Sequence, residues 1–276
     1  MCAYSKTTSY KKTLMHISLL LIALQFFSCA LEKEPAYELV WSDDFTKNGA
    51  PDSTFWTYDI GTGSNGWGNN EIQSYTRDPK NVRVENDLLI IDAIKENDQW
   101  TSARLKTQGR NEWQYGKIEF RAKLPQGVGT WPALWMLGND IPTVGWPACG
   151  EIDIMEHVGR NPGVVQSALH NSSSYGDTFN KGETSVPDFH SAFHIYQLIW
   201  DQHKMDFLVD DKLFYTYAPQ EKTDATWPYN KPYFIIMNIA IGGGFGGQVD
   251  PQLKHARMEI DYVKVYQRSG KISQTN

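Results

Sequence analysis

The chain has 276 residues, of which 41% are hydrophobic and 13% aromatic, so it is long enough to bury the core of one sizeable domain. Its formal net charge of −6 at pH 7 argues against a nucleic-acid-binding protein, because such a protein needs a basic surface.

The first 28 residues have the layout of a secretory signal peptide. Three lysines precede the apolar run ISLLLIAL, which is too short to span a bilayer. The letters FFSC that follow resemble a bacterial lipobox, with Phe26 where leucine is usual, which predicts lipidation of Cys29 and an exported outer-membrane or cell-surface lipoprotein. The alternative is cleavage near Ala30 and release as a soluble periplasmic or extracellular protein.

Removal of residues 1–28 takes away three lysines and no acids, which leaves 23 basic and 32 acidic residues and a net charge of −9. Such a surface suits a neutral substrate. Cys2 leaves with the signal peptide and Cys29 carries lipid, so Cys149 is alone and no structural disulfide is expected. We interpret Cys149 as a small buried apolar residue, because no His and Asn/Asp pattern favours a thiolate.

Residues 29–37 are expected to form a short polar tether, residues 38–268 one domain, and residues 269–276 a polar tail. No stretch shows a convincing helical period beyond about one turn. Short strand-like runs alternate with turn signals instead, which predicts an all-β sandwich of two antiparallel sheets. The runs lie at residues 37–45, 81–95, 102–108, 116–124, 133–137, 151–158, 164–170, 192–200, 204–217, 233–243 and 257–267.

One run, GEIDIMEHVG, sets three carboxylates into an apolar strand, where lone charges are costly to desolvate. In a regular strand Glu151 and Asp153 share one face, and Met155 follows them on it. One extra residue, a β-bulge at about Ile154 and Met155, would return Glu156 to that face. Like charges so close raise one another's pKa, so one carboxyl can be ionised while another stays protonated, as a retaining glycosidase requires.

The letters EIDIME resemble the signature of glycoside hydrolase family 16 in its bulged E-x-D-x-x-E form, and the blocks WPALWMLG and MEIDYVKVYQ on either side agree. The similarity runs from about Leu39 to Tyr266. Two further blocks, GWGNNEIQSYT and YGKIEFRAKLP, resemble those of bacterial laminarinases, which are endo-acting β-1,3-glucanases. The resemblance implies a concanavalin A-like jelly roll whose concave sheet forms the substrate cleft. Within the motif, we expect Glu151 to be the nucleophile, Glu156 the general acid and then base, and Asp153 the residue that tunes their charges.

Aromatic and polar side chains around the acids are expected to bind sugar. By the resemblance, Trp131 and Trp135 adjoin the acidic strand, and exposed aromatic rings stack on the apolar faces of sugars. For Trp67, Trp113 and Trp146, in or beside similar blocks, core packing is an equal alternative. The polar substrate-binding residues are expected to be Asn69, Arg104, His170 and Asn238, with Glu71 either beside them or a surface-loop residue.

Histidines near the acids also suggest a metal site, at His157 or His170. The metal-binding spacings are missing and His157 is expected to face away from the acids, so no cofactor is expected for catalysis. A structural calcium ion is expected on the convex face instead, because Asp44, Asn86 and Asp261 occupy positions that resemble a calcium site of the family, with Asn86 giving only its backbone carbonyl. Oxygen ligands suit calcium.

The resemblance implies a secreted or surface-anchored endo-β-1,3-glucanase that acts as a monomer on a laminarin-like β-1,3-glucan polysaccharide and meets the membrane only through its lipid. Within the enzymes, the alternatives are a mixed-linkage β-1,3-1,4-glucanase or a galactan hydrolase such as an agarase or carrageenase. A non-catalytic glucan-binding lipoprotein on the same sandwich is the alternative from another class. Because a binding module has no use for two glutamates and an aspartate in a water-poor cleft, Glu151 and Glu156 favour the enzyme.

Overall fold

The computed structural model describes Met1 and residues 36–269. The chain divides into two units, Met1–Ala36 and Tyr37–Asn276, and every described strand belongs to the second. The predicted signal peptide, Cys29 and residues 270–276 of the predicted tail lie outside the described residues. In the described part, no helix is long and apolar enough to cross a bilayer.

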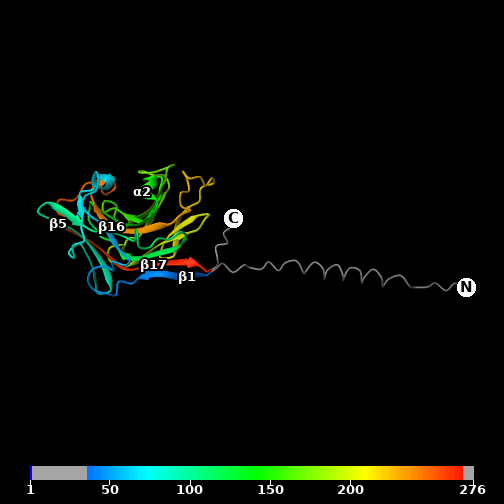
Figure 1. Cartoon of the computed structure of the whole chain (residues 1–276), viewed down its shortest axis with the longest axis horizontal. Helices are drawn as coiled ribbons and strands as arrows, with labels where there is room; N and C mark the ends of the chain where they lie inside the picture. Colours follow the sequence, from blue (N-terminus) through cyan, green and yellow to red (C-terminus); the bar gives the residue numbers. More distant parts are fainter. Residues whose placement is uncertain (2–35, 270–276) are drawn as a thin grey trace. The chain divides into compact units, whose positions relative to one another are not determined.

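Two sheets make up the body, and within residues 36–269 the larger has ten strands and the smaller seven (Figure 1). The larger sheet runs β15 (Lys212–Tyr217), β14 (Met205–Val209), β13 (His194–Trp200), β8 (Gly116–Lys123), β17 (His255–Arg268), β5 (Leu88–Glu96), β6 (Gln99–Ser102) and β3 (Gln73–Tyr75), with β1 (Tyr37–Asp43) against β17 and β4 (Val82–Glu85) against β5. The smaller sheet runs β12 (Lys181–Ser185), β11 (Val164–His170), β10 (Glu151–His157), β9 (Thr130–Gly138), β16 (Tyr233–Ile241), β7 (Arg104–Lys106) and β2 (Thr57–Asp59). The predicted all-β sandwich is confirmed, and its strand pairs are antiparallel except for β3 with β6.

The core lies between the two sheets. One continuous cluster of buried side chains joins Ile118 and Phe120 of β8, in the larger sheet, to Ile152 of β10 and Met237 of β16 in the smaller sheet. Along β8 the apolar Ile118 and Phe120 alternate with the polar Lys117, Glu119 and Arg121. This alternation is expected for a strand with one face in a core. The hydrophobic period of two therefore fixes which side chains each strand turns outward.

Left-handed residues explain where two of the long predicted runs break. Asn86 and Asp87, with φ of 55° and 58°, separate β4 from β5, and Asp210 and Asp211, with φ of 49° and 62°, separate β14 from β15. Two consecutive residues with positive φ form the turn of a tight hairpin, and Asn and Asp tolerate this conformation better than most residues. Each of these runs is therefore a hairpin.

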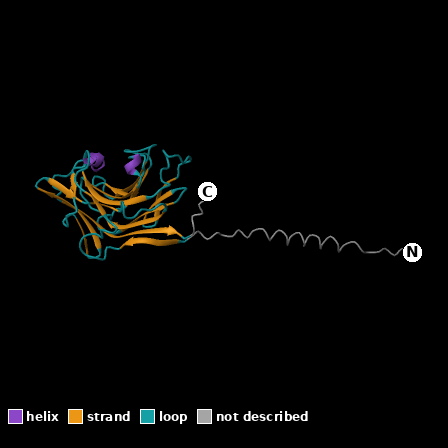
Figure 2. Ribbon diagram, viewed as in Figure 1, coloured by secondary structure: helices purple, strands orange, loops and turns teal. Residues whose placement is uncertain are grey.

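Three short helical segments interrupt the connections: η1 (Gly66–Asn70), α2 (Ile141–Val144) and α3 (Gly243–Gly246). Figure 2 shows helical segments on one side of the strands, and in Figure 1 β16 lies between α2 and the strands β17 and β1. The outer face of the smaller sheet therefore faces these connections. As predicted, no helix in residues 36–269 exceeds about one turn.

The predicted calcium ligands lie at the end of β1, in the turn between β4 and β5, and in β17. Asp44 Oδ1 lies 3.1 Å from Lys264 Nζ, and Asp261 Oδ2 lies 2.5 Å from the Arg121 guanidinium. The backbone N–H of the third residue, Asn86, donates to a side chain in the connection between β1 and β2. The donors suit calcium by type, but each carboxylate already has a cationic partner with which calcium must compete. A calcium ion at this place stays a prediction.

Candidate active site

The predicted β-bulge in β10 is confirmed, and it determines which side chains form the site. The register of β10 against β9 shifts between Asp153 and Met155. Ile154 and Met155 are both packed in the core, which two consecutive residues of a regular strand cannot be. The extra residue returns Glu156 to the outer face of the smaller sheet, beside Glu151 and Asp153.

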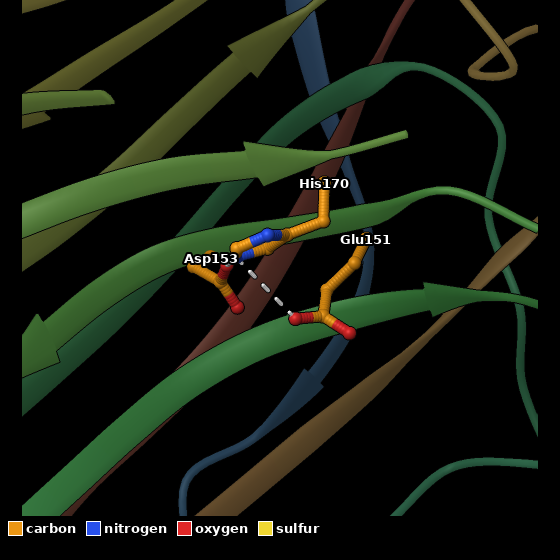
Figure 3. A group of neighbouring side chains, drawn as sticks. All are labelled: Glu151, Asp153 and His170. Carbon is orange, nitrogen blue, oxygen red and sulfur yellow. Dashed lines mark ion pairs between the residues drawn. The ribbon is translucent and has the colours of Figure 1, made fainter. Parts of the chain in front are cut away.

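His170 completes this group from the neighbouring strand, where it is paired with Glu151. Its Nε2 lies 3.1 Å from Asp153 Oδ2 and 3.8 Å from Glu151 Oε1 (Figure 3). His170, which was predicted to bind substrate, therefore also contacts the acids. We refer to Glu151, Asp153, Glu156 and His170 as the acidic cluster. One ligand atom from each of Glu151, Asp153 and His170 lies within 4.8 Å of the others, so a metal ion fits there by geometry, and catalysis without a cofactor stays a prediction.

Side-chain N–H groups hold both glutamates. The Trp146 indole donates to Glu151 Oε2 at 3.0 Å, and the Trp131 indole donates to Glu156 Oε1 at 2.9 Å. Gln166, the cross-strand neighbour of Glu156, donates to its other oxygen at 3.2 Å. These donors fix the orientation of each carboxyl and favour its ionised form. Neither Gln166 nor the contact of Trp146 with Glu151 was predicted from the sequence.

Burial raises the pKa of every carboxyl in the acidic cluster. It raises the pKa of Glu151 to about 8, with the charge of Asp153 as the second cause. Burial and the charge of Glu156 hold the pKa of Asp153 well above its usual range. The pKa of Glu156 is raised by burial, against the opposing effect of His170 and the hydrogen bonds from the Trp131 and Gln166 side chains. The cluster therefore keeps protons near neutral pH that separated carboxyls would lose, as an acid catalyst needs.

Two of the other predicted polar residues, Asn238 and Arg104, lie on the β9, β16 and β7 side of the cluster. Asn238 of β16 accepts a hydrogen bond from the Trp135 indole at 2.8 Å. The Arg104 guanidinium lies 5.0 Å from the centre of the Trp67 ring and 4.7 Å from that of Trp135, and Arg104 Nε lies 3.0 Å from Asp59 Oδ2. Trp135 is therefore half-buried against Arg104, and its binding of sugar stays a prediction.

Glu71 is the centre of a second hydrogen-bonded group. Its carboxylate accepts hydrogen bonds from Asn69 Nδ2 at 3.2 Å, Gln73 Nε2 at 2.6 Å and the Tyr75 hydroxyl at 3.2 Å. The Tyr75 hydroxyl in turn accepts from Asn238 Nδ2 at 3.1 Å. Because Glu71 is only 9% exposed and joins the predicted Asn69 and Asn238, it is not a surface-loop residue.

The tight turn of η1 positions Asn69 and Trp67. The backbone N–H of Glu71 donates to the Gly66 carbonyl at 3.2 Å, which closes the segment. A Cβ atom at Gly66 would lie 2.4 Å from the Glu71 backbone nitrogen, and φ there is 57°, so the turn requires glycine. Asn69 and Trp67 therefore reach the site from a loop whose path is fixed by close backbone packing.

Three further residues lie away from the site. Trp113 is in the core, with its ring centre 5.0 Å from that of Trp41, so the core-packing alternative holds for it. His157 is buried against Phe189 and faces away from the acids, as predicted. Cys149 is fully buried, and burial raises the pKa of its thiol to about 12, which agrees with our interpretation of an unreactive apolar residue.

Comparisons with known proteins agree with this geometry. The Glycosyl hydrolases family 16 profile matches residues 69–264. A beta-glucanase of Rhodothermus marinus is 44% identical over 273 residues, which cover 93% of this chain and 94% of the relative. The crystal structure of the laminarinase from Flavobacterium sp. UMI-01 is 49% identical and has a TM-score of 0.81, over 83% of this chain and 100% of that chain. A variant of SCLam, a non-specific endo-β-1,3(4)-glucanase co-crystallised with 1,3-β-D-cellotriosyl-glucose, is 39% identical and has a TM-score of 0.79, over 85% and 100%. The predicted jelly roll is thus confirmed, and the chain belongs to glycosyl hydrolase family 16 and is a glycoside hydrolase.

Proposed function

We propose that the protein is an endo-acting β-1,3-glucanase that hydrolyses laminarin-like polysaccharide with retention of the anomeric configuration. The bulge in β10 carries this proposal, because it sets Glu151 and Glu156 on one face with Asp153 between them and an indole N–H on each glutamate. The substrate is supported by the names of the relatives, beta-glucanase and laminarinase, at 44% and 49% identity.

In the first step, the ionised carboxylate of Glu151 attacks the anomeric carbon. The bond from that carbon to the leaving oxygen breaks, and Glu156 gives its proton to the oxygen. The result is a glucosyl group bound covalently to Glu151 and a released sugar chain. The Trp146 N–H at 3.0 Å and the nearby His170 ring favour the ionised form of Glu151 before the attack.

In the second step, Glu156 accepts a proton from water, and the oxygen of that water attacks the anomeric carbon. The bond to Glu151 breaks, Glu151 leaves as a carboxylate, and two inversions give net retention. The Trp131 and Gln166 donors favour the carboxylate form of Glu156, so they assist the proton transfer of the first step and hold the base for the second.

Asp153 acts on the charge of its neighbours. Burial and the charge of Glu156 raise its pKa well above the usual range, so Asp153 holds a proton more readily than an isolated aspartate does. Carboxyls this close titrate as a unit, and the reactive form is the one in which Glu151 is ionised while Glu156 is protonated. Because the charge of Asp153 raises the pKa of Glu151, a proton taken up by Asp153 favours the ionised form of Glu151.

A mixed-linkage β-1,3-1,4-glucanase is the second candidate, favoured by the likeness to SCLam, a non-specific endo-β-1,3(4)-glucanase. The two candidates separate in the oligosaccharides released from laminarin and from lichenan. We expect laminarin to be hydrolysed much faster than lichenan, and its products to form a ladder of oligosaccharides from internal cleavage. Equal rates on both would favour the second candidate, and hydrolysis of agarose without laminarin would overturn both.

Proton NMR of the fresh product tests the mechanism. We expect the β-anomer to form first, and a first-formed α-anomer would show that a water attacks directly and that the roles of Glu151 and Glu156 are wrong. Glu151→Ser should be folded and unable to hydrolyse glucan, yet able to couple an α-glucosyl fluoride to an acceptor. Glu183→Ser, which changes an exposed glutamate of the same sheet, is the matched control and should keep full activity.

A further inference from the structure

Two exposed aromatic rings continue the acidic cluster outward. The Trp146 ring lies 5.4 Å from the Tyr175 ring, edge to face at 79°, and 6.0 Å from the His170 ring. Trp146 is 45% exposed and Tyr175 55% exposed, although Trp146 also donates its N–H to Glu151. The pair therefore reaches from the carboxylate at the reaction centre to open solvent.

The loop that carries Tyr175 has a fixed conformation. Asn171 is fully buried, and its Oδ1 accepts hydrogen bonds from the Ser173 N–H at 3.0 Å, the Ser173 hydroxyl at 2.6 Å and the Ser174 N–H at 3.2 Å. The Ser174 hydroxyl lies 2.8 Å from that of Thr178, which donates to the Leu169 carbonyl at 3.1 Å. These bonds tie the loop to the end of β11, so the ring that follows Ser174 is held outward.

The exposed aromatic rings of the described residues lie in one part of the molecule. Among the described residues, the exposed aromatic side chains are Trp146, Tyr175 and Phe179, and all three lie in the connections that flank β10, β11 and β12. A rigid loop that keeps such a ring in water forgoes the favourable burial of its apolar surface. Aromatic faces of this kind stack on the apolar C–H faces of sugar rings.

The order of strands places Tyr175 opposite to the polar residues. In the smaller sheet, β11 and β12 lie on one side of β10, while β9, β16 and β7 lie on the other. Arg104 and Asn238 come from β7 and β16, and Tyr175 comes from the loop between β11 and β12. A chain of sugars that crosses the strands at the acids therefore meets Arg104 and Asn238 on one side and the aromatic pair on the other.

We propose that Trp146 and Tyr175 form a binding subsite for a glucosyl residue of the β-glucan chain, on the side of the scissile bond opposite to Arg104 and Asn238. The inference rests on the proposed function, since it assigns one part of the substrate of that same site. Tyr175 contributes binding area only, whereas Trp146 also orients Glu151. Because Trp146 contacts Glu151 directly, the binding area added by Tyr175, beyond Trp146, is the part that short substrates do not reach.

The test measures kcat/KM on β-1,3-glucan oligosaccharides of increasing length for the full chain and its variants. Tyr175→Ala should lower kcat/KM for the longest oligosaccharide roughly fivefold, as expected for one lost stacking contact, and leave the shortest cleaved one unchanged. Tyr175→Phe keeps the ring and should match the parent protein. Leu213→Ala, which removes an equally exposed apolar side chain from β15 in the larger sheet, is the control and should also match.

Binding is measured separately by calorimetry in a Glu151→Gln background, where the oligosaccharide is not consumed. Tyr175→Ala should weaken the affinity for the longest oligosaccharide by the same roughly fivefold factor. An equal loss at every length would mean that Tyr175 acts through Trp146 and Glu151, and no loss at any length would mean that the ring binds nothing. Either result overturns the subsite while the parent protein still cleaves laminarin. A parent protein without activity on any β-1,3-glucan would instead overturn the proposed function, and this inference with it.

Discussion

Glu151 is held by groups that have opposite effects on its charge. Burial and the charge of Asp153 favour the protonated form, whereas His170 favours the carboxylate. The Trp146 N–H at 3.0 Å also favours the carboxylate. Because these effects raise the pKa of Glu151 overall, the folded protein binds a proton there more tightly than the unfolded chain does. The free energy of unfolding therefore depends on pH.

Glu151→Gln should stabilise the protein increasingly between about pH 5 and pH 8. The pKa of Glu151 is about 8 in the folded protein, above its ordinary value of 4.5, so in that window the folded state holds a proton that the unfolded state has lost. The parent protein therefore loses stability as pH rises through the window, whereas glutamine has no proton to lose. Urea unfolding at several pH values should show the difference widen by on the order of a few kcal/mol.

Glu183→Gln is the control for this experiment, because Glu183 is an exposed glutamate of β12. Its difference from the parent protein should be flat with pH. A flat difference for Glu151→Gln as well would show that the folded protein leaves Glu151 with its ordinary affinity for protons.

At the scale of the element, the bulge in β10 sets how many residues separate the two glutamates. Deletion of Met155 removes the extra residue and leaves a regular strand with Glu151, Asp153 and Glu156 still on one face, because the side-chain period is two. Deletion of Ile152 instead puts Glu151 and Asp153 on opposite faces. Both residues are fully buried, so both deletions remove core packing.

Deletion of Met155 should therefore leave reduced but measurable glucan hydrolysis, and deletion of Ile152 should abolish it. Each deletion is expected to destabilise the fold by about 2–5 kcal/mol, so circular dichroism and thermal unfolding must accompany the activity assay. Activity that survives better without Ile152 than without Met155 would contradict the role assigned to the bulge.

Two of the predicted calcium ligands are Asp44, which directly follows β1, and Asp261 of β17. If calcium binds with Asp44 and Asp261 as ligands, millimolar calcium should raise Tm relative to protein treated with a chelator, because a ligand that binds only the folded state stabilises it. Asp261→Asn should abolish the rise. An equal Tm with and without calcium would contradict a calcium ion at Asp44 and Asp261, which form ion pairs with Lys264 and Arg121.

Long alternating runs made most of the strands predictable, whereas short polar strands were missed. β12 reads KGETS and β6 reads QWTS, and neither has an apolar stripe of its own. Their strand conformation depends on pairing with β11 and β5, which no local pattern contains. The first predicted run, which begins at residue 37, is confirmed as β1, where Tyr37 pairs with Arg268.

The site was predictable where residue type and period agreed, as for the acids and His170. Gln166 was missed because a polar residue in a strand looks like any solvent-facing residue until the register with Glu156 across the bulge is known. Tyr175 was missed because it lies among serines and glycine, which indicate a surface turn. Hydrogen bonds from Asn171 give that turn its conformation, and such bonds follow from tertiary structure.

At the scale of the whole molecule, the predicted lipid anchor decides where the enzyme works. If Cys29 is acylated, the protein should partition with membranes, because two or more acyl chains hold a protein stably where one does not. Cys29→Ser should release it with glucanase activity intact, which fractionation and mass spectrometry of the N-terminus can measure. Membrane retention of the Cys29→Ser protein equal to that of the parent would contradict the anchor.

The pairing of β1 with β17 has a further consequence. Tyr37, the first residue of β1, lies opposite Arg268, the last residue of β17. The two ends of the catalytic body therefore meet at neighbouring backbone positions, and a short glycine and serine linker suffices to join them. New termini opened at the hairpin turn of Asp210 and Asp211 would give a circular permutant with the same strand order. A carrier domain joined directly before Tyr37 or directly after Arg268 would start from neighbouring positions of the larger sheet.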